Sequence, residues 1–307
     1  MKKLLLAVSL ICSYSASMAQ INEGGKPLGL RYTDQLQEVV FERMPTVDVE
    51  TLLAEDEINY PEKVGPYRFG EKHFISMTLE NSGQWETLPN GDRIWRLGVV
   101  SEDAFSLNFI FENFHLPLGG KLFIYNEEHG HIMGAFTNKN NREDGWFGTF
   151  LLKGDQAVIE YIEPIEVQGQ GTLELKEIIH GYRDILGWYK DDTRGGGSGS
   201  CNIDVECPLG DGWDDQINSV GILITSGGTT FCTGAMVADV PQSGTPYFLT
   251  ANHCGGNVGN WSVGFNYQAS SCNGTTSDLP WTQSLSGATQ RASNAGSDFS
   301  LLEWDNA

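Results

Sequence analysis

The amino-acid sequence predicts an all-β protein in two parts, and three observations carry this prediction. Short apolar or alternating runs recur along the chain at spacings that are typical of antiparallel strands. Turns that contain proline, asparagine and glycine separate these runs, such as PNGD at 89–92 and PLGG at 117–120. A stretch rich in glycine and serine, GWYKDDTRGGGSGS at 187–200, favours a flexible junction between the two parts.

The part before this junction predicts an antiparallel β-sandwich. Its first residues, 20–60, are mixed and polar, with one short helix expected near 48–57. The strand-like runs begin at about residue 74 and lie at 74–79, 93–100, 105–111, 121–125, 146–152 and 157–163. We expect the aromatic residues of these runs to form the core between two sheets.

Two features of this part suggest binding functions, and each has a simpler interpretation. Trp85, Trp95 and Trp146 fit a carbohydrate-binding role, but the core of a β-sandwich explains them with fewer assumptions. The segment EEHGH at 127–131 offers two histidines and two glutamates to a metal ion, although surface turns often have this composition. We therefore expect no metal site and no cofactor.

The part after the junction is also expected to be β-structure. Its apolar runs lie at 220–225, 230–237, 247–251, 261–267 and 298–304. No run combines the length of a helix with helical periodicity. The junction itself contains Lys190 and Arg194, so it is either a plain linker or a cleavage site between a pro-region and a mature protein. We favour cleavage, because the cysteines of the chain begin just after it.

The first residues predict a secretory signal peptide. Lys2 and Lys3 precede the apolar run LLLAVSLI, and small residues allow cleavage after Ala19. This run is too short to span a membrane. The expected organisation is therefore a signal peptide at 1–19, a pro-region with the sandwich at 20–186, the junction at 187–200 and a final part at 201–307.

The cysteines agree with export and are confined to the final part. Of the six cysteines, Cys12 leaves with the signal peptide. The remaining five are Cys201, Cys207, Cys232, Cys254 and Cys272. Clustered cysteines in an exported chain indicate disulfides. Because five is an odd number, one thiol must have its partner elsewhere.

The charge of the chain excludes some partners. A formal net charge of −21 opposes binding to nucleic acid or to an anionic membrane. From residue 195 onward there are ten acidic residues, one arginine and no lysine. The simpler interpretation is a solvated acidic surface. The alternative is an enzyme that cuts after basic residues and contains few such sites itself.

The segment YFLTANHCGG at 247–256 is the strongest candidate for catalytic chemistry. An apolar strand leads into His253, and Cys254 directly behind it could anchor the loop through sulfur. A histidine after a strand is, taken alone, more often structural. A general base in a serine protease needs a rigid position and a carboxylate that fixes its tautomer.

Several separated motifs together resemble the trypsin-like serine proteases. These are FCTGAMV at 231–237, YFLTANHC at 247–254 and SDFSLLE at 297–303. The bacterial lysyl endopeptidase group is the most similar, because SGSCNIDVECPLGDGWDDQINSVG at 198–221 and FNYQASSC at 265–272 resemble its signatures. The resemblance implies that the final part is the first β-barrel of a double barrel. It also implies protein or peptide substrates and a secreted bacterial enzyme.

On this resemblance His253 is the general base and Asp298 is the carboxylate that orients it. Asp278 and Asp305 compete for the second role, but only Asp298 begins an apolar strand that can hold a carboxylate still. The resemblance also implies two disulfides, Cys232–Cys254 and Cys207–Cys272. Cys201 is then unpaired within this chain, and its partner is expected further toward the C-terminus.

The nucleophile of the family is expected after the aspartate, in a Gly-x-Ser-Gly context that the 307 residues do not contain. Ser243 and Ser198 superficially resemble that context, but Ser198 precedes the first strand of this part and Ser243 lies in an expected hairpin loop before the histidine. Neither offers the strand, the supporting residues or the chain order of the family. We therefore expect a precursor of a secreted serine endopeptidase that cuts after lysine or another basic residue and is inactive as this chain alone. The alternative is a non-catalytic secreted adhesion protein with a degenerate protease half-domain.

Overall fold

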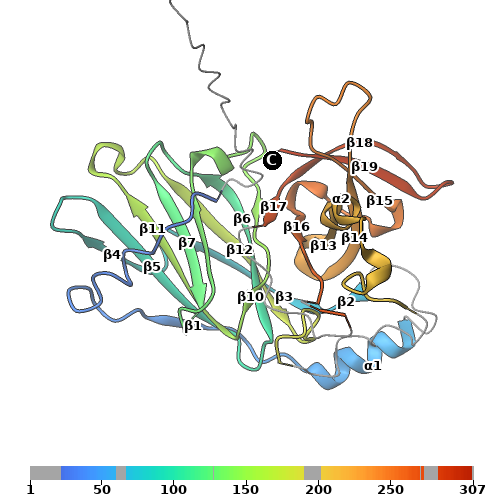
Figure 1. The fold of residues 1–307 in the computed structure, drawn as a ribbon. Coiled ribbons are helices and arrows are strands. Elements are labelled where there is room, and N and C mark those ends of the chain that lie inside the picture. The colour runs from blue at the N-terminus through green and yellow to red at the C-terminus, as the bar shows by residue number, and fades with distance from the viewer. Residues whose placement is uncertain are drawn as a thin grey trace, which may run out of the picture.

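The structure is a computed structural model that describes residues 22–59, 67–126, 128–189, 202–269, 271–272 and 283–305. It is built mostly from β-strands in three sheets, which confirms the all-β prediction. Figure 1 shows two sheets of one region beside the curled third sheet of the other. We refer to 22–189 as the sandwich region and to 202–305 as the barrel region.

Two sheets face each other in the sandwich region. The first has the order β1-β5-β11-β7-β8, with β4 added to β5, and the second has the order β10-β6-β12-β3, with β9 added to β6. The strands of the first sheet are β1 (Phe41–Arg43), β4 (Gln84–Thr87), β5 (Arg93–Val100), β7 (Lys121–Asn126), β8 (Ile132–Phe136) and β11 (Gln156–Glu163). Those of the second are β3 (Gly70–Thr78), β6 (Ser106–His115), β9 (Phe147–Gly148), β10 (Leu152–Lys153) and β12 (Thr172–Gly181).

The main core lies between these sheets and follows from the alternation of residues along each strand. Trp95, Leu97 and Val99 of β5 face Phe109 and Phe111 of β6 within one buried cluster. The other face of the first sheet packs against residues of the N-terminal segment 28–41, which form a separate apolar cluster with it. Both faces of β5 are therefore buried, which explains its nearly continuous apolar sequence.

The third sheet forms the barrel region. Its order is β17-β16-β13-β14-β15-β19-β18, with β2 of the sandwich region added to β14. The strands are β13 (Val220–Thr225), β14 (Thr230–Val237), β15 (Tyr247–Thr250), β16 (Ser262–Phe265), β17 (Ser284–Ser286), β18 (Ala288–Asn294), β19 (Phe299–Trp304) and β2 (Tyr67–Arg68).

This third sheet closes on itself at Gly287. Only that glycine separates β17, which pairs with β16, from β18, which pairs with β19. Its N–H donates to the carbonyl of Trp261 at 2.9 Å, and its carbonyl accepts from the N–H of Asp305 at 3.1 Å. A positive φ of 77° lets the chain pass from one neighbour to the other. The sheet is therefore a barrel, with Phe248, Trp261 and Trp304 buried inside it.

Helices are few and short in the described residues. The expected helix near 48–57 is present as α1 (Val49–Asn59). A six-residue helix, α2 (Asp214–Ser219), was not predicted, because its sequence has no apolar stripe. Single 3₁₀ turns are η1 (Asn138–Asn140), η2 (Ile165–Val167), η4 (Pro208–Gly210), η5 (Ser226–Gly228), η6 (Asn252–Cys254) and η7 (Val258–Asn260). Within the described ranges, no helix has the length and apolar character needed to cross a membrane.

Some strand predictions were wrong in detail. The run 146–152 is not one strand but two short ones, β9 and β10, because Phe150 turns away to pack against the barrel region. Strands β8, β12 and β18 were not predicted. The sequences of β12 and β18 contain many polar residues, and these strands still form because both take part in antiparallel ladders, which are interrupted by register shifts.

Candidate active site

His253 lies in η6, the tight turn that follows β15. The strand ends at Thr250, and the hydroxyl of that residue donates to the carbonyl of Thr233 at 2.8 Å, which fixes the strand end to β14. Within the turn, successive side chains point in opposite directions. Cys254 is 1% exposed, whereas the His253 side chain is 49% exposed. The adjacent cysteine thus enters the barrel while the imidazole faces solvent.

Two disulfides join the pairs that the resemblance implies. Cys232 of β14 is bonded to Cys254, with the two Cα atoms 6.1 Å apart. This bond ties the turn that carries His253 to the neighbouring strand. Cys207 is bonded to Cys272, and it connects the segment before β13 to the loop after β16. Cys201 lies outside the described residues.

Asp298 lies in the turn of the β18–β19 hairpin, directly before β19. Its backbone has a φ of +51°, a left-handed conformation that aspartate tolerates better than most residues. The side-chain oxygen of Asn294, at the end of β18, accepts from the N–H of Ser297 at 2.9 Å and stabilises this turn. The predicted strand that begins at 298 is β19, and its Leu302 is buried in the barrel.

His253 and Asp298 meet through both carboxylate oxygens. Nδ1 of His253 is 2.6 Å from Oδ2, and the backbone N–H of His253 donates to Oδ1 at 2.9 Å. These two hydrogen bonds, first that of the imidazole and then that of the backbone, hold the pKa of Asp298 below its ordinary value. An ionised carboxylate only accepts hydrogen bonds, so Nδ1 must carry the proton.

The contact with Asp298 uses Nδ1 of His253 and leaves the other ring nitrogen, Nε2, free of the carboxylate. With the proton on Nδ1, a neutral imidazole presents the lone pair of Nε2 away from the carboxylate. Nε2 has no hydrogen-bond partner among the described residues, and the side chains of His253 and Asp298 are each 49% exposed. A proton-donating group that approached from solvent could therefore reach it.

The competing candidates are engaged elsewhere or undescribed. Asp305 accepts from the Thr289 hydroxyl at 2.9 Å and forms an ion pair with Arg142. The Ser243 hydroxyl is 2.6 Å from Asp239 in an exposed loop. Five residues that were singled out in the sequence lie outside the described ranges: Ala19, Lys190, Arg194, Ser198 and Asp278.

One group of potential metal ligands occurs in the described part of the chain, and it does not fit a metal ion. Cys232, Cys254 and His253 place ligand atoms within 4.8 Å of one another. Both sulfurs are already joined in the disulfide and are not available as thiolates. In the EEHGH segment, His131 is buried and accepts the backbone N–H of Lys153 at 2.9 Å, whereas His129 is exposed.

A cluster of one serine and two histidines in the sandwich region was not predicted from the sequence. The Ser101 hydroxyl is 3.0 Å from Nε2 of His73 and 2.8 Å from Nδ1 of His180. No local motif signals it, because the residues come from β3, from β12 and from the loop after β5. The three side chains are at most 8% exposed, so no polymer substrate can reach Ser101. Burial also lowers the pKa of His180 to about 4.

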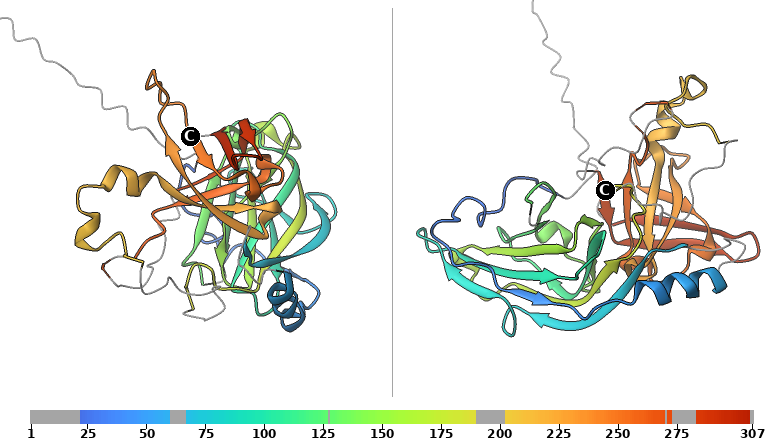
Figure 2. Two further views of the ribbon diagram at one scale, coloured as in Figure 1. Left: turned by 90° about the vertical axis from the view of Figure 1, so that its right-hand side faces the viewer. Right: turned by 90° about the horizontal axis from the view of Figure 1, so that it is seen from below.

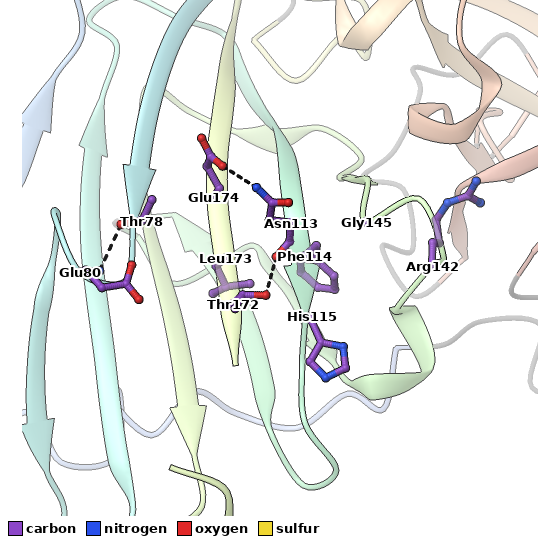
Figure 3. Close-up of a pocket in the computed structure, with 10 residues that line it drawn as sticks. All are labelled: Thr78, Glu80, Asn113, Phe114, His115, Arg142, Gly145, Thr172, Leu173 and Glu174. Atoms are coloured by element: carbon purple, nitrogen blue, oxygen red, sulfur yellow. Dashed lines mark hydrogen bonds between the residues drawn. The ribbon is translucent and has the colours of Figure 1, made fainter. Parts of the chain in front are cut away.

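Trp85 and Trp95 belong to the core of the sandwich region, whereas Trp146 is half-buried and lies outside that cluster. Trp95 is 2% exposed and donates to the carbonyl of Ser82, and Trp85 packs edge-on against Tyr161. A pocket of about 530 Å³ lies at one end of this region, far along the chain from His253. Figure 3 shows hydrogen bonds between some of its polar groups, with Glu174 accepting from Asn113, whereas His115 and Arg142 have no bond to the other residues drawn.

Comparison with known protein families agrees with the motifs of the barrel region. Residues 195–307 match the family model described as the lysyl endopeptidase, C-terminal domain. The match begins in the junction and covers both members of the His253–Asp298 pair. It supports a relationship between this part of the chain and the lysyl endopeptidases, and hence with proteases.

Proposed function

We propose that the chain is the precursor of a secreted serine-type endopeptidase, with His253 as general base and Asp298 as the residue that orients it. The observation that carries the proposal is the contact of one carboxylate with both the ring and the backbone of His253. A residue held in this way has a fixed tautomer and orientation, as acyl transfer to a serine requires. The similarity of 195–307 to the lysyl endopeptidase family supports the same conclusion.

The nucleophile would be a serine outside these 307 residues. Such a serine would lie within about 3 Å of Nε2, transfer its proton there and attack the carbonyl carbon of a peptide bond. The resulting imidazolium would be stabilised by the Asp298 carboxylate. The proton would then pass to the leaving amine, and water would release the acyl group by the same route in reverse.

Three further features belong to this proposal. The substrate would be cut after lysine, in line with the related family and with a lysine-free stretch from 195 to 307. Export would follow from the signal peptide at 1–19 and agrees with the two disulfides. The region 20–186 would be a pro-region, separated from the protease by cleavage in the junction.

The test is to sequence the gene beyond codon 307 and to express the complete reading frame. We expect a Gly-x-Ser-Gly segment in that extension, labelling of its serine by a fluorophosphonate, and product peptides that end in lysine by mass spectrometry. His253→Ala should lower kcat by about 10⁶-fold and Asp298→Asn by about 10⁴-fold.

Two results would overturn this assignment. One is a reading frame without such a serine. The other is an active extended protein whose His253→Ala variant keeps its rate. For the 307-residue chain alone, the proposal expects no serine labelled by the fluorophosphonate and no turnover after proteolytic trimming. Labelling of Ser243 in that chain would instead move the nucleophile to the exposed loop before β15.

A further inference from the structure

We propose that the sandwich region stays bound to the barrel region as a non-covalent subunit after the junction is cut, and that it braces the barrel while leaving the His253–Asp298 pair open. The inference rests on the proposed function only in assuming cleavage between 187 and 200. The two regions meet through a strand pair, a shared apolar cluster and an ion-pair clamp, and each contact is independent of catalysis.

The strand pair extends the barrel sheet into the sandwich region. In β2, Tyr67 and Arg68 pair with Phe231 and Thr230 of β14 in antiparallel register. The next two residues continue the contact, because the N–H groups of Phe69 and Gly70 both donate to the carbonyl of Thr229, at 2.9 and 3.2 Å. Adding a strand in this way satisfies backbone groups that an edge would expose.

The short strand β2 is itself held in place by α1. Asp56 of this helix is 6% exposed and accepts from Nε of Arg68 at 2.7 Å. The same carboxylate accepts from Arg183 at 2.7 Å and from the Tyr182 hydroxyl at 2.8 Å. This buried network fixes β2 before it reaches β14, so the docking strand is preorganised.

The apolar cluster joins both regions in one core. Along β13, Leu223 faces the interior of the barrel, while Ile222 and Ile224 face the other way. These two isoleucines are 3% and 1% exposed because the sandwich region covers them. The residues on its side of the cluster are Phe69, Phe150, Leu151, Ile185 and Leu186. Separation would expose apolar surface on both sides, which opposes release.

The ion-pair clamp reaches the point where the barrel closes. Arg142 of the sandwich region binds Asp144 through Nε and Nη2, at 3.0 and 2.9 Å. Its Nη1 pairs with Asp305, whose N–H bonds to the carbonyl of Gly287. The guanidinium lies so close to Gly287 that a Cβ there would be 2.7 Å from Nη1. Arg142 therefore holds the closing residue and the end of β19 together.

The catalytic pair lies on a different side of the barrel from these contacts. Figure 1 shows the β18–β19 hairpin extending away from the sandwich region, and the right-hand view of Figure 2 shows the same arrangement from below. The contacts with the sandwich region fall on β13, on η5 and the start of β14, on η7, on β16 and the following Tyr267, and on the closing residue Gly287. The sandwich region thus braces the barrel and does not occlude His253.

The experiment uses the full chain with a recognition site for a specific protease placed in the glycine-rich stretch 195–199. After quantitative cutting, the two fragments are examined by size-exclusion chromatography with light scattering and by native mass spectrometry. We expect one 1:1 complex that separates only in denaturant. Two folded fragments that elute separately at micromolar concentration would overturn the proposal.

A glycine at the contact between the sandwich and barrel regions allows a substitution that tests this contact directly. A Cβ on Gly148 would lie 2.6 Å from the carbonyl oxygen of Asn260, so Gly148→Ala wedges η7 away from the sandwich region. Gly130→Ala is the control, because a Cβ at that exposed turn meets nothing within 4 Å. In the uncut chain the linker keeps the two regions at about millimolar effective concentration, so both variants should remain folded.

After cutting, the two variants should behave differently. Gly148→Ala should raise the dissociation constant at least tenfold, whereas Gly130→Ala should leave it unchanged. Arg142→Ala should also weaken the complex and reduce its dependence on salt. Equal dissociation constants for wild type and Gly148→Ala would show that the two regions do not bind through this surface. The measurement does not depend on hydrolytic activity of this protein, so the failure of either proposal leaves the other standing.

Discussion

At the scale of single residues, the order histidine–cysteine at 253–254 has a simple physical meaning. A tight turn directs neighbouring side chains to opposite sides, so one residue can be buried while the other is exposed. Cys254 uses the buried side to form a disulfide with Cys232, and His253 uses the exposed side to meet Asp298. The rigidity of the imidazole therefore derives from the residue next to it.

Removing this disulfide should weaken both the fold and the contact between His253 and Asp298. The double variant Cys232→Ala/Cys254→Ala opens a loop with a sequence separation of 22 and should lower the free energy of unfolding by about 3 kcal/mol. The pKa of Asp298 should rise toward its ordinary value, because the imidazole that lowers it is less fixed. Chemical denaturation and carbon NMR of the carboxyl group measure the two effects.

The other disulfide is the matched control. Cys207→Ala/Cys272→Ala should also destabilise the chain, but it should leave the pKa of Asp298 unchanged, because this bond lies away from η6. An equal rise of that pKa in both double variants would contradict the local role of Cys254.

The buried histidine cluster predicts a loss of stability in acid. Burial lowers the pKa of His180 to about 4, and it also lowers that of His73. Between this value and the ordinary pKa of about 6.5, the unfolded chain binds a proton that the folded chain excludes. Stability is therefore fully present above pH 6.5 and is lost as the pH falls toward 4, by up to about 1.4 kcal/mol per pH unit for each histidine.

Denaturant titrations at a series of pH values check this prediction. His180→Gln keeps a group that can bond to Ser101 but has no titrating ring, so its stability should fall less steeply between pH 6.5 and 4. Carboxylates titrate in both proteins and cancel in the comparison. Identical slopes for wild type and variant would show that His180 is not responsible.

At the scale of elements, the glycine of the FCTGAMV motif has a packing role. Gly234 of β14 pairs with Thr250 of β15, and Phe248 and Leu249 of the same strand lie close to its Cα. A Cβ at this position would be 2.3 Å from the Phe248 ring and 2.5 Å from the carbonyl oxygen of Leu249. No rotamer change relieves the second contact, because the atom belongs to the backbone.

Gly234→Ala should therefore separate β14 from β15 and disturb the strand that leads to His253. We expect destabilisation of about 1–3 kcal/mol, as for other overpacked positions. Thermal unfolding and hydrogen exchange at Leu249 measure the effect. Gly130→Ala again provides the control, and unchanged protection of β15 in the Gly234 variant would argue against this packing role.

Several elements could be predicted from the sequence because their patterns are local. The strands β5, β13 and β14 begin and end at the predicted residues, since turns and apolar runs mark both ends. The strand β12 could not be predicted, because its TLELKEIIHG sequence carries four charged or imidazole side chains. It forms between β3 and β6, where partners from distant parts of the chain satisfy its backbone.

The candidate site shows the same division. The motifs of the sequence named His253 and Asp298, and the resemblance supplied their proposed roles. The hydrogen bond from the backbone N–H of His253 to Asp298 could not be predicted from the sequence, because it depends on a left-handed turn stabilised by Asn294. The buried cluster of Ser101 was likewise invisible, because tertiary structure alone brings its residues together.

At the scale of the whole molecule, the distribution of basic residues predicts where trypsin cuts first. Arg291 is the one basic residue in 195–307, and it pairs with Glu303 within the β18–β19 hairpin. Lys190 and Arg194 lie in the glycine-rich junction, whose composition is typical of accessible linkers.

Brief digestion of the native chain should therefore give two main fragments, separated between 190 and 195. Intact-mass spectrometry identifies them, and Lys190→Gln/Arg194→Gln should delay the cut at least tenfold. Early cleavage within the sandwich sheets, before any cut in the junction, would contradict this division of the chain.

The positive φ of Asp298 determines how its carboxylate can be removed without moving the chain. Asparagine enters the left-handed region about as readily as aspartate, whereas alanine and glutamate do so with more difficulty. Asparagine is thus a nearly pure deletion of charge at this corner of the hairpin. Asp298→Ala would remove the charge and also shift the main chain. The loss of activity in that variant would therefore come partly from the altered backbone and not only from the missing carboxylate.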